Sequence, residues 1–427
     1  MTKRAVRRGE PLQASLLLVN AKQATPGSQS SLRESNRARI VEAIKHYGGL
    51  TQVELAGATG LSAATVSNIV KELAVAGIVH TTPSTRSGRR AQHVTLARTL
   101  GLVVGVQFAL RHMRVALADA SGTIVTEHQL PLGNDHRADA GLDRAALLIA
   151  DMLDSVDALN SDVLAVAVGL PAPIDARRAT VSTPGILRGW DNVPVAEVLR
   201  RRTGRPVYVE NDSNLGALGE LRYGAAQGCQ QAVYVRVSQR IGAGIIIDGH
   251  VYTGALGTAG EIGHMTIDED GPICRCGNRG CLETRAGAHV LLESLRGSHG
   301  VLTMRDMINR ALEGDLGCRR VIGDAGHHIG IAVANLCNLL NPSRVVIGGD
   351  FARAGDLLLD PLRDTVERSA LAGITESMEI VTGTLGDDAE IRGAIALAID
   401  KAGIHADVGA TALEVPTFSY ETTKEDR

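Results

Sequence analysis

The stretch that decides the fold runs from Gly260 to Glu283 and reads GEIGHMTIDEDGPICRCGNRGCLE. It places three cysteines within eight residues, has a histidine shortly before them, and contains glycines that permit a tight loop. One imidazole and three thiolates suit a closed, tetrahedral zinc site. Because such a site has no open coordination position, the metal would hold the loop rather than activate water. The alternative is a glycine-rich loop with reduced thiols. The predicted ligands are His264, Cys274, Cys276 and Cys281.

Acidic and amide side chains lie beside this loop and at one earlier point in the chain. Glu261 precedes the histidine, Glu283 follows the last cysteine, and Glu210-Asn211-Asp212 lies where a predicted strand leads into a helix over 215–223. Carboxylate and amide groups at strand ends suit paired hydrogen bonds to vicinal hydroxyls, so a sugar is the predicted ligand. Singly, each residue would also fit a solvated loop or a helix cap. As a set, they favour a binding site.

The first hundred residues predict a winged helix-turn-helix, with a two-stranded wing after the recognition helix. Thr51 and Glu54 fit a capping box at the start of the second helix, whose Val53, Leu55 and Ala56 would face inward, and Ser62 would cap the third helix. The alternative is a small helical domain without a role in DNA binding. The predicted elements are helices over 35–47, 52–58 and 62–76 and strands over 78–82 and 92–96.

Charge is divided unevenly along the chain. Residues 1–98 hold fourteen Lys and Arg against five Asp and Glu, a net +9, which leaves −12 for the rest of a chain whose total is −3. A basic head on an acidic body indicates that the head binds nucleic acid. The recognition helix lacks arginine, so its short polar side chains would read bases while wing arginines bind phosphates or a minor groove. The predicted DNA contacts are Ser62, Thr65, Ser67, Asn68, Lys71, Arg86, Arg89 and Arg90.

After residue 100, strands alternate with helices, which indicates an α/β body of two lobes with a cleft between them. Three consecutive antiparallel strands, a helix and a buried strand come first, and strands alternate with helices again in the second half. The predicted strands are 102–108, 113–118, 124–130, 163–168, 232–237, 244–247 and 345–347, and the predicted helices are 139–158, 317–340, 355–371 and 388–402.

The string 260–283, with Val209-Glu-Asn-Asp-Ser-Asn214 and Leu218-Gly-Glu220, closely resembles the ROK family of repressors, uncharacterised reading frames and sugar kinases. The resemblance covers about residues 35–403, including the head, and points to a ROK transcriptional repressor. It implies an actin-like ATPase or sugar-kinase fold of two RNase-H-like lobes, one structural zinc per chain on the four ligands above, and Asp212 at the position of the kinases' catalytic base. The implied sugar contacts are Asn211, Asp212, Glu261, His264 and Glu283.

Two phosphate-binding loops of the family's kinases are altered in this chain. Where the kinases read Asp-x-Gly-Gly-Thr after the first strand, this chain reads Gln107-Phe-Ala-Leu-Arg111, so side chains replace a glycine turn that lets backbone N–H groups approach phosphate. The second loop, usually Gly-Thr-Gly-Ile-Gly, reads Ser238-Gln-Arg-Ile-Gly242. Only Gly348-Gly349 remains of the nucleotide motifs, and a strand-to-helix turn explains it equally well. We therefore expect no enzymatic activity and a vestigial base at Asp212.

The predicted domains are a flexible basic arm at 1–30, the winged helix-turn-helix at 31–98, a ROK sugar-sensing domain at 99–403 and a flexible tail at 404–427. Within the sensing domain, one lobe would hold residues 99–211 and 388–403 and the other residues 212–387.

Together these features predict a sequence-specific repressor of sugar or amino-sugar metabolism genes. It would bind an inverted-repeat operator in double-stranded DNA as a homodimer or homotetramer and respond to a sugar, amino sugar or sugar phosphate. The alternatives are an active ATP-dependent sugar kinase with a DNA-binding head, and a scaffold or ligand-independent DNA-binding protein.

Composition excludes several other classes of protein. One Trp, six Tyr and three Phe are too few for a reader of single-stranded nucleic acid, and six cysteines are too few for a disulfide scaffold. No apolar run is long enough to span a membrane. We therefore expect a cytoplasmic bacterial protein that joins the nucleoid when it binds DNA.

Overall fold

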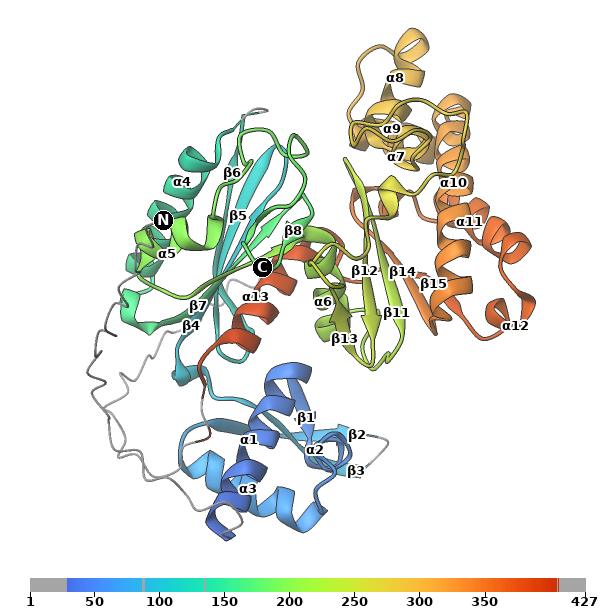
Figure 1. Ribbon diagram of the computed structural model, residues 1–427. Coiled ribbons are helices and arrows are strands. Elements are labelled where there is room, and N and C mark those ends of the chain that lie inside the picture. The colour runs from blue at the N-terminus through green and yellow to red at the C-terminus, as the bar shows by residue number, and fades with distance from the viewer. Residues whose placement is uncertain (1–28, 87–88, 134–135, 405, 407–427) are drawn as a thin grey trace, which may run out of the picture.

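A computed structural model of the chain describes residues 29–86, 89–133, 136–404 and 406. The predicted arm lies outside this range except for Gln29 and Ser30, which begin a helix, and most of the predicted tail lies outside it too. Within the described residues, no helix is both long and apolar enough to cross a membrane. The chain forms a small head and two larger lobes (Figure 1).

The head is the expected winged helix-turn-helix, in which three helices share one apolar core and a hairpin forms the wing. A short first strand, which the sequence did not predict, pairs with the second wing strand. The elements are α1 (Gln29–Tyr47), β1 (Gly49–Thr51), α2 (Gln52–Thr59), α3 (Ala63–Val75), β2 (Val79–Arg86) and β3 (Arg89–Leu96).

Local sequence signals set the helix starts in the head. Thr51 and Glu54 form the capping box of α2, and the Ser62 hydroxyl accepts a hydrogen bond from the Thr65 backbone N–H at the start of α3. The prediction that Val53 faces inward was wrong: its side chain is 78% exposed, because Leu55 occupies the inner face of this short helix.

Each lobe is built on a five-stranded sheet, and the two sheets have the same topology. In each sheet, three consecutive antiparallel strands come first. A fourth strand then pairs in parallel with the first strand, and a fifth pairs in parallel with the fourth. The strand orders are β6-β5-β4-β7-β10 and β13-β12-β11-β14-β15. This repeat confirms the two-lobed fold. Lobe 1 holds β4 (Leu102–Phe108), β5 (His112–Asp119), β6 (Ile124–Pro131), β7 (Val163–Leu170), β10 (Val207–Asn211) and the small pair β8 (Ile174–Asp175) and β9 (Thr180–Val181). Lobe 2 holds β11 (Ala232–Val237), β12 (Ile241–Ile247), β13 (His250–Tyr252), β14 (Arg344–Gly348) and β15 (Glu379–Thr382).

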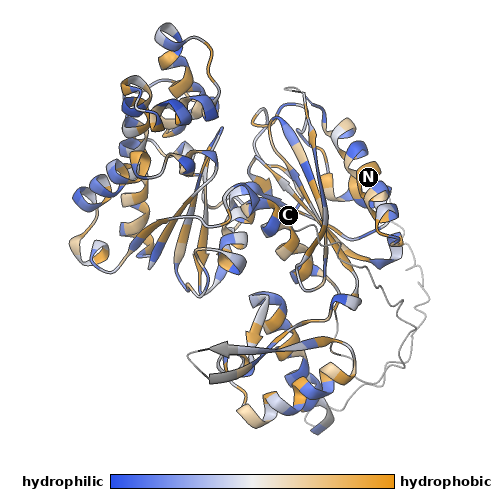
Figure 2. Cartoon of the chain, turned by 180° about the vertical axis from the view of Figure 1, so that it is seen from behind, coloured by the Kyte–Doolittle hydropathy of each residue, from blue (hydrophilic) through white to orange (hydrophobic). Residues whose placement is uncertain are grey.

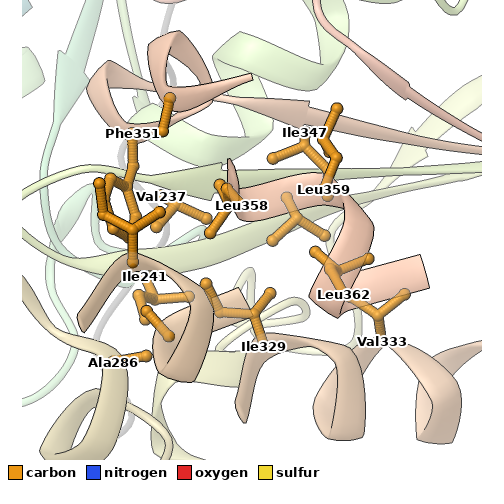
Figure 3. Close-up of a cluster of buried hydrophobic side chains, with 14 of the residues drawn as sticks. Val237, Ile241, Ala286, Ile329, Val333, Ile347, Phe351, Leu358, Leu359 and Leu362 are labelled. Carbon is orange, nitrogen blue, oxygen red and sulfur yellow. The ribbon is translucent and has the colours of Figure 1, made fainter. Parts of the chain in front are cut away.

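Helices cover the sheets and supply the other half of each core. In lobe 2, Ile329 and Val333 on one helix and Leu358 on the next meet Val237 and Ile347 on the sheet (Figure 3). Apolar residues gather along the sheets and the helix faces that pack on them (Figure 2). Lobe 1 carries α4 (Ala138–Ser155) and α5 (Val195–Thr203), and lobe 2 carries α7 (Glu283–Ala286), α8 (Ala288–His299), α9 (Met304–Leu312), α10 (Leu316–Leu340), α11 (Asp356–Ser369) and α12 (Ala372–Thr375).

Two further helices, α6 (Asp212–Tyr223) and α13 (Ala389–Lys401), cross each other between the lobes (Figure 1). The crossing is close because it uses glycine: a Cβ at Gly219 would lie 2.2 Å from the Ala389 carbonyl oxygen, and a Cβ at Gly393 would lie 1.8 Å from that of Leu215. Larger residues cannot fit at these points. The two helices therefore form one tightly packed pair, with α13 against β4 and β7 and α6 against β11 and β12.

The chain returns to the head after α13. Ile404 and Ala406 are buried in an apolar cluster that joins the head core to α13. The predicted flexible tail from residue 404 is therefore wrong at its first residues, because these two apolar side chains are held in the cluster.

Candidate functional site

The cysteine–histidine cluster is assembled as its spacing predicts. Cys276 Sγ lies 3.7 Å from Cys281 Sγ, His264 Nδ1 lies 3.6 Å from Cys274 Sγ, and all four ligand atoms lie within 4.8 Å of one another. Ligands at about 2.3 Å from a tetrahedral zinc would be about 3.8 Å apart, so the donor set fits such an ion. This group could hold a metal.

Backbone geometry holds the loop in this shape. Isolated bridges pair Thr266 with Cys281 and Ile273 with Arg279. Gly280 has φ +64°, and a Cβ there would lie 1.5 Å from the Asp268 carbonyl oxygen, so only glycine fits. The loop is thus folded back on itself beside Glu283.

The five predicted sugar contacts line one pocket. Asn211 and Asp212 come from the start of α6, Glu261 and His264 from the loop before the cysteines, and Glu283 from the start of α7. Asp212 and Glu283 are buried, and burial with the charges of Asp212 and Glu283 raises the pKa of Glu261 to about 7. Several carboxyl groups thus share one small space, which suits a ligand with many hydroxyls.

Asn211 also caps the helix that follows it, which is the alternative role given for these residues in the sequence analysis. Its side-chain oxygen accepts hydrogen bonds from the backbone N–H groups of Ser213 and Asn214, and its Nδ2 donates to the Ala172 carbonyl at 2.9 Å. It is therefore the N-cap of α6 as well as a lining residue of the pocket.

Three arginines that the sequence analysis did not assign to this pocket also line it. Arg236 Nη1 lies 3.3 Å from Asp212 Oδ2, and Arg275 Nη2 lies 2.8 Å from Glu283 Oε1. Arg240 donates instead to two carbonyls. Burial lowers the pKa of Arg236, but the carboxylates of Asp212 and Glu390 outweigh it and leave that pKa raised. The sequence contained signals that could have placed two of these arginines at the site, because Arg275 lies between two cysteines and Arg240 interrupts the second phosphate loop.

The pocket is narrow in this structure, although it is open to solvent on one side. Its volume is about 30 Å³. A sugar therefore needs the arginine side chains to move or the lobes to separate before it can enter.

The predicted DNA contacts on the recognition helix lie on the face of α3 away from the head core. Asn68 and Lys71 are exposed and one helical turn apart, and Thr65 and Ser67 are half-buried beside them. Ser62 is exposed, with its hydroxyl engaged as the N-cap. Arg86 and Arg89 are cross-strand partners near the wing tip, and Arg90 pairs with Thr85. α3 lies at the end of the head remote from the lobes (Figure 1).

The head is fastened to the lobes at the C-terminal end of α1. Arg222, near the end of α6, pairs with Asp400 of α13 at 2.9 Å and donates to the Lys45 carbonyl. His46 Nε2 lies 3.0 Å from the Gly249 carbonyl oxygen, and its ring stacks on His250 with centroids 4.2 Å apart. We call this set of contacts the head seam. One helix, α6, thus begins in the pocket lined by the five predicted sugar contacts, called the sugar pocket below, and ends at the seam.

Comparison with known proteins supports the same organisation. The xylose repressor of Bacillus subtilis (strain 168) is 30% identical over 377 residues, which cover 87% of this chain and 97% of the repressor. A glucokinase of Halalkalibacterium halodurans is 32% identical over 313 residues, 68% of this chain and 92% of the kinase. A crystal structure of a ROK family transcriptional regulator, a homolog of the E. coli MLC protein, covers 86% of this chain and 97% of its own with a TM-score of 0.71; at 24% identity it shows the fold.

A winged helix-turn-helix joined to a two-lobed, sugar-kinase-like domain defines a class of DNA-binding regulators. The chain belongs to the ROK family, whose model matches residues 103–401, and a model of the MarR family matches residues 34–90 of the head.

Proposed function

We propose that the chain is a sugar-responsive transcriptional repressor that has lost kinase activity. One observation carries the proposal: the predicted sugar contacts converge at the start of α6, and the other end of that helix holds the DNA-binding head through Arg222. A sugar, amino sugar or sugar phosphate is the effector, and genes for sugar or amino-sugar metabolism are the targets. Because such a protein acts on the chromosome, we place it in the cytoplasm.

Each group in the pocket has a role in this proposal. Asp212, Glu261 and Glu283 accept hydrogen bonds from sugar hydroxyls, and His264 offers Nε2 to the ligand while Nδ1 faces the thiols. One zinc ion per chain, held by His264 and the three cysteines, would fix the loop structurally. The loop then presents the carboxylates in a fixed arrangement.

The head supplies DNA recognition. Asn68 and Lys71, exposed on α3, reach a major groove, and the wing arginines bind phosphates or a minor groove. We propose a homodimer or homotetramer, because two-fold symmetry presents two heads to the half-sites of an inverted-repeat operator.

The link between the sites is mechanical. A twelve-residue helix spans about 18 Å, which is the length of α6 between the pocket and the head seam. Because a sugar must open a pocket of about 30 Å³, its entry displaces the start of α6 or the lobes against each other. The tightly packed pair of α6 and α13 carries that displacement to Arg222 and changes the spacing of the heads.

An active sugar kinase is the second candidate. Asp212 at the position of the family's catalytic base favours it, as does the similarity to a glucokinase. Against it, Arg236 contacts Asp212 and Arg240 stands where the kinases have a glycine of the second phosphate loop. Phosphoryl transfer depends on positioning and charge neutralisation at these loops, so we propose that the chain is not an enzyme.

Operator selection tests the proposal. Randomised duplexes are enriched on the zinc-loaded protein, and binding of the selected duplex is measured with and without each sugar of a panel. An inverted repeat whose binding one sugar changes supports the proposal. Sugar-dependent release of ADP from ATP that is absent in Asp212→Asn would establish the kinase instead.

A further inference from the structure

A second group of potential metal ligands lies in lobe 2 and shares no residue with the cysteine–histidine cluster. His299 is the last residue of α8, Asp315 is the N-cap of α10, and Cys318 lies in the first turn of that helix. His299 Nε2 lies 3.0 Å from Asp315 Oδ2, and one ligand atom from each of the three residues lies within 4.8 Å of the others. The packing of α8 on α10 therefore gathers an imidazole, a carboxylate and a thiol at one point.

The arrangement has the dimensions of a zinc site. Nitrogen and oxygen ligands at about 2.0–2.1 Å from a tetrahedral zinc are about 3.3 Å apart, close to the separation of His299 Nε2 and Asp315 Oδ2. Cys318 is fully buried in the core of lobe 2, whereas the Asp315 side chain is 31% exposed. An ion can thus enter past the carboxylate and reach the sulfur.

The hydrogen bonds of Ser298 fix which ring nitrogen of His299 faces the cluster. The Ser298 hydroxyl oxygen lies 3.2 Å from the Leu295 carbonyl oxygen and 2.7 Å from His299 Nδ1. Because a carbonyl only accepts, the hydroxyl proton goes to Leu295, and the Ser298 oxygen accepts from the Nδ1–H of His299. The neutral ring therefore directs the lone pair of Nε2 at Asp315. A metal-binding histidine needs this tautomer, with its other nitrogen held by a hydrogen bond.

A lone pair and a carboxylate repel each other at 3.0 Å, so a cation must lie between them. A proton on His299 Nε2 would give an ordinary ion pair with Asp315, and that alternative needs no third group. The buried thiol of Cys318 favours a metal ion, because a proton shared by nitrogen and oxygen does not use a third ligand atom. The carboxylate is also oriented: its Oδ1 accepts a hydrogen bond from the Cys318 backbone N–H at 2.8 Å, which leaves Oδ2 for the ion.

Charge and ligand chemistry select the class of ion. A thiolate, a carboxylate and a neutral imidazole carry two negative charges, which a divalent cation balances, so the filled site is neutral where it is half-buried. Mg²⁺ and Ca²⁺ prefer oxygen ligands alone, whereas Zn²⁺ binds sulfur, nitrogen and oxygen together. Three protein ligands leave one tetrahedral position for water.

We propose that His299, Asp315 and Cys318 bind a second zinc ion, in addition to the ion of the cysteine–histidine cluster. The ion replaces the proton of the Cys318 thiol, and that proton passes to water. The metal then ties the end of α8 to the start of α10. None of the three residues lines the sugar pocket, so the site is independent of effector binding and of the proposed function.

Metal analysis of the full chain tests this inference. The protein is stripped with a chelator, reloaded with excess Zn²⁺ and dialysed, and zinc is then counted per chain. We expect the wild type to hold one more zinc per chain than Cys318→Ser, whatever the occupancy of the other cluster. With Co²⁺ in place of Zn²⁺, the difference between these two proteins should contain a sulfur-to-cobalt absorption band, because Cys318 supplies a thiolate.

Two more variants protect the test against misfolding. Ser298→Ala removes the hydrogen bond to His299 Nδ1 at an exposed position and should weaken zinc binding by about 10- to 100-fold, as measured by competition with a chromophoric chelator. His299→Ala should lose the ion as Cys318→Ser does. The matched controls should keep it: Cys337→Ser replaces another fully buried cysteine of α10, and His289→Ala replaces an exposed histidine of α8.

Three results would overturn the inference. Equal zinc content in the wild type and Cys318→Ser would leave an ordinary ion pair of His299 with Asp315. An equal loss of zinc from Cys337→Ser would assign the loss to the packing of α10 rather than to a ligand. Zinc binding that Ser298→Ala and His299→Ala leave unchanged would remove the imidazole from the site. None of these results bears on the sugar response, which the operator assay tests separately.

Discussion

Arg222→Met should uncouple the sugar pocket from the DNA-binding head. The substitution keeps an unbranched side chain, but it removes the ion pair with Asp400 and the hydrogen bond to the Lys45 carbonyl. Breaking a fully buried ion pair costs about 3–5 kcal/mol, because the remaining charge is left without a partner. Asp400 is 23% exposed, so water can reach it, and we expect a cost of about 1–3 kcal/mol at the head seam.

The variant should keep both binding activities and lose the communication between them. α3 lies at the end of the head remote from the lobes, so operator affinity without effector should stay close to that of the wild type. Allosteric couplings are typically about 1–3 kcal/mol, or about 5- to 150-fold in affinity, and we expect nearly all of this factor to disappear. The assay is fluorescence anisotropy of a labelled operator duplex at zero and saturating effector, with calorimetry to show that the effector still binds.

Arg344→Met is the matched control. Arg344 also pairs with one carboxylate, Glu379, and donates to one carbonyl, that of Ala225, but it lies on β14 in lobe 2, outside the head seam. Its variant should respond to effector as the wild type does. If Arg222→Met still released the operator by the wild-type factor, transmission through α6 and the seam would be refuted.

Further predictions concern the metal cluster, the sugar pocket and the head. Cys276→Ser should release the zinc and abolish the sugar response while the head stays folded; metal analysis that finds no zinc in the wild type would contradict this. The wild type should release no ADP above background with ATP and any sugar. Asp212→Ala should weaken effector binding by about 1–3 kcal/mol, because a buried hydroxyl of the effector loses its acceptor. Unchanged affinity would show that this residue is not part of the binding site. Arg89→Ala with Arg90→Ala should weaken all DNA sites alike and flatten the log–log salt dependence by up to about 0.9 per lost phosphate contact; a loss confined to one sequence would show base readout instead. Asn68→Ala should cost roughly 1–3 kcal/mol on the matched operator only, as measured on a panel of single-base variants, and a uniform loss would assign it to the backbone.

Local patterns predicted the elements whose residues are close in sequence. The capping box at Thr51 and the cap at Ser62 set two helix starts, because a cap needs only its own turn. The cysteine spacing likewise predicted a compact cluster, since Cys274, Cys276 and Cys281 belong to one loop whose bridges close within sixteen residues.

The arginines of the pocket could not be placed in the same way. Arg236 and Asp212 come together only through the packing of α6 on β11, and the Arg222 contact with Lys45 joins residues 177 apart. Such contacts depend on how the lobes and the head assemble, which periodicity does not encode. The prediction for Val53 was wrong because Leu55 and Thr59, one helical turn apart, form the buried face of this eight-residue helix and Val53 lies outside it.

Reciprocal linkage between effector and operator tests the central claim most directly. Operator affinity is measured at zero and saturating effector, and effector affinity is measured on the free and the operator-bound protein. We predict that effector weakens operator binding by about 5- to 150-fold and that operator weakens effector binding by the same factor. An operator affinity that saturating effector leaves unchanged would contradict the account and leave a DNA-binding protein with an uncoupled sensor.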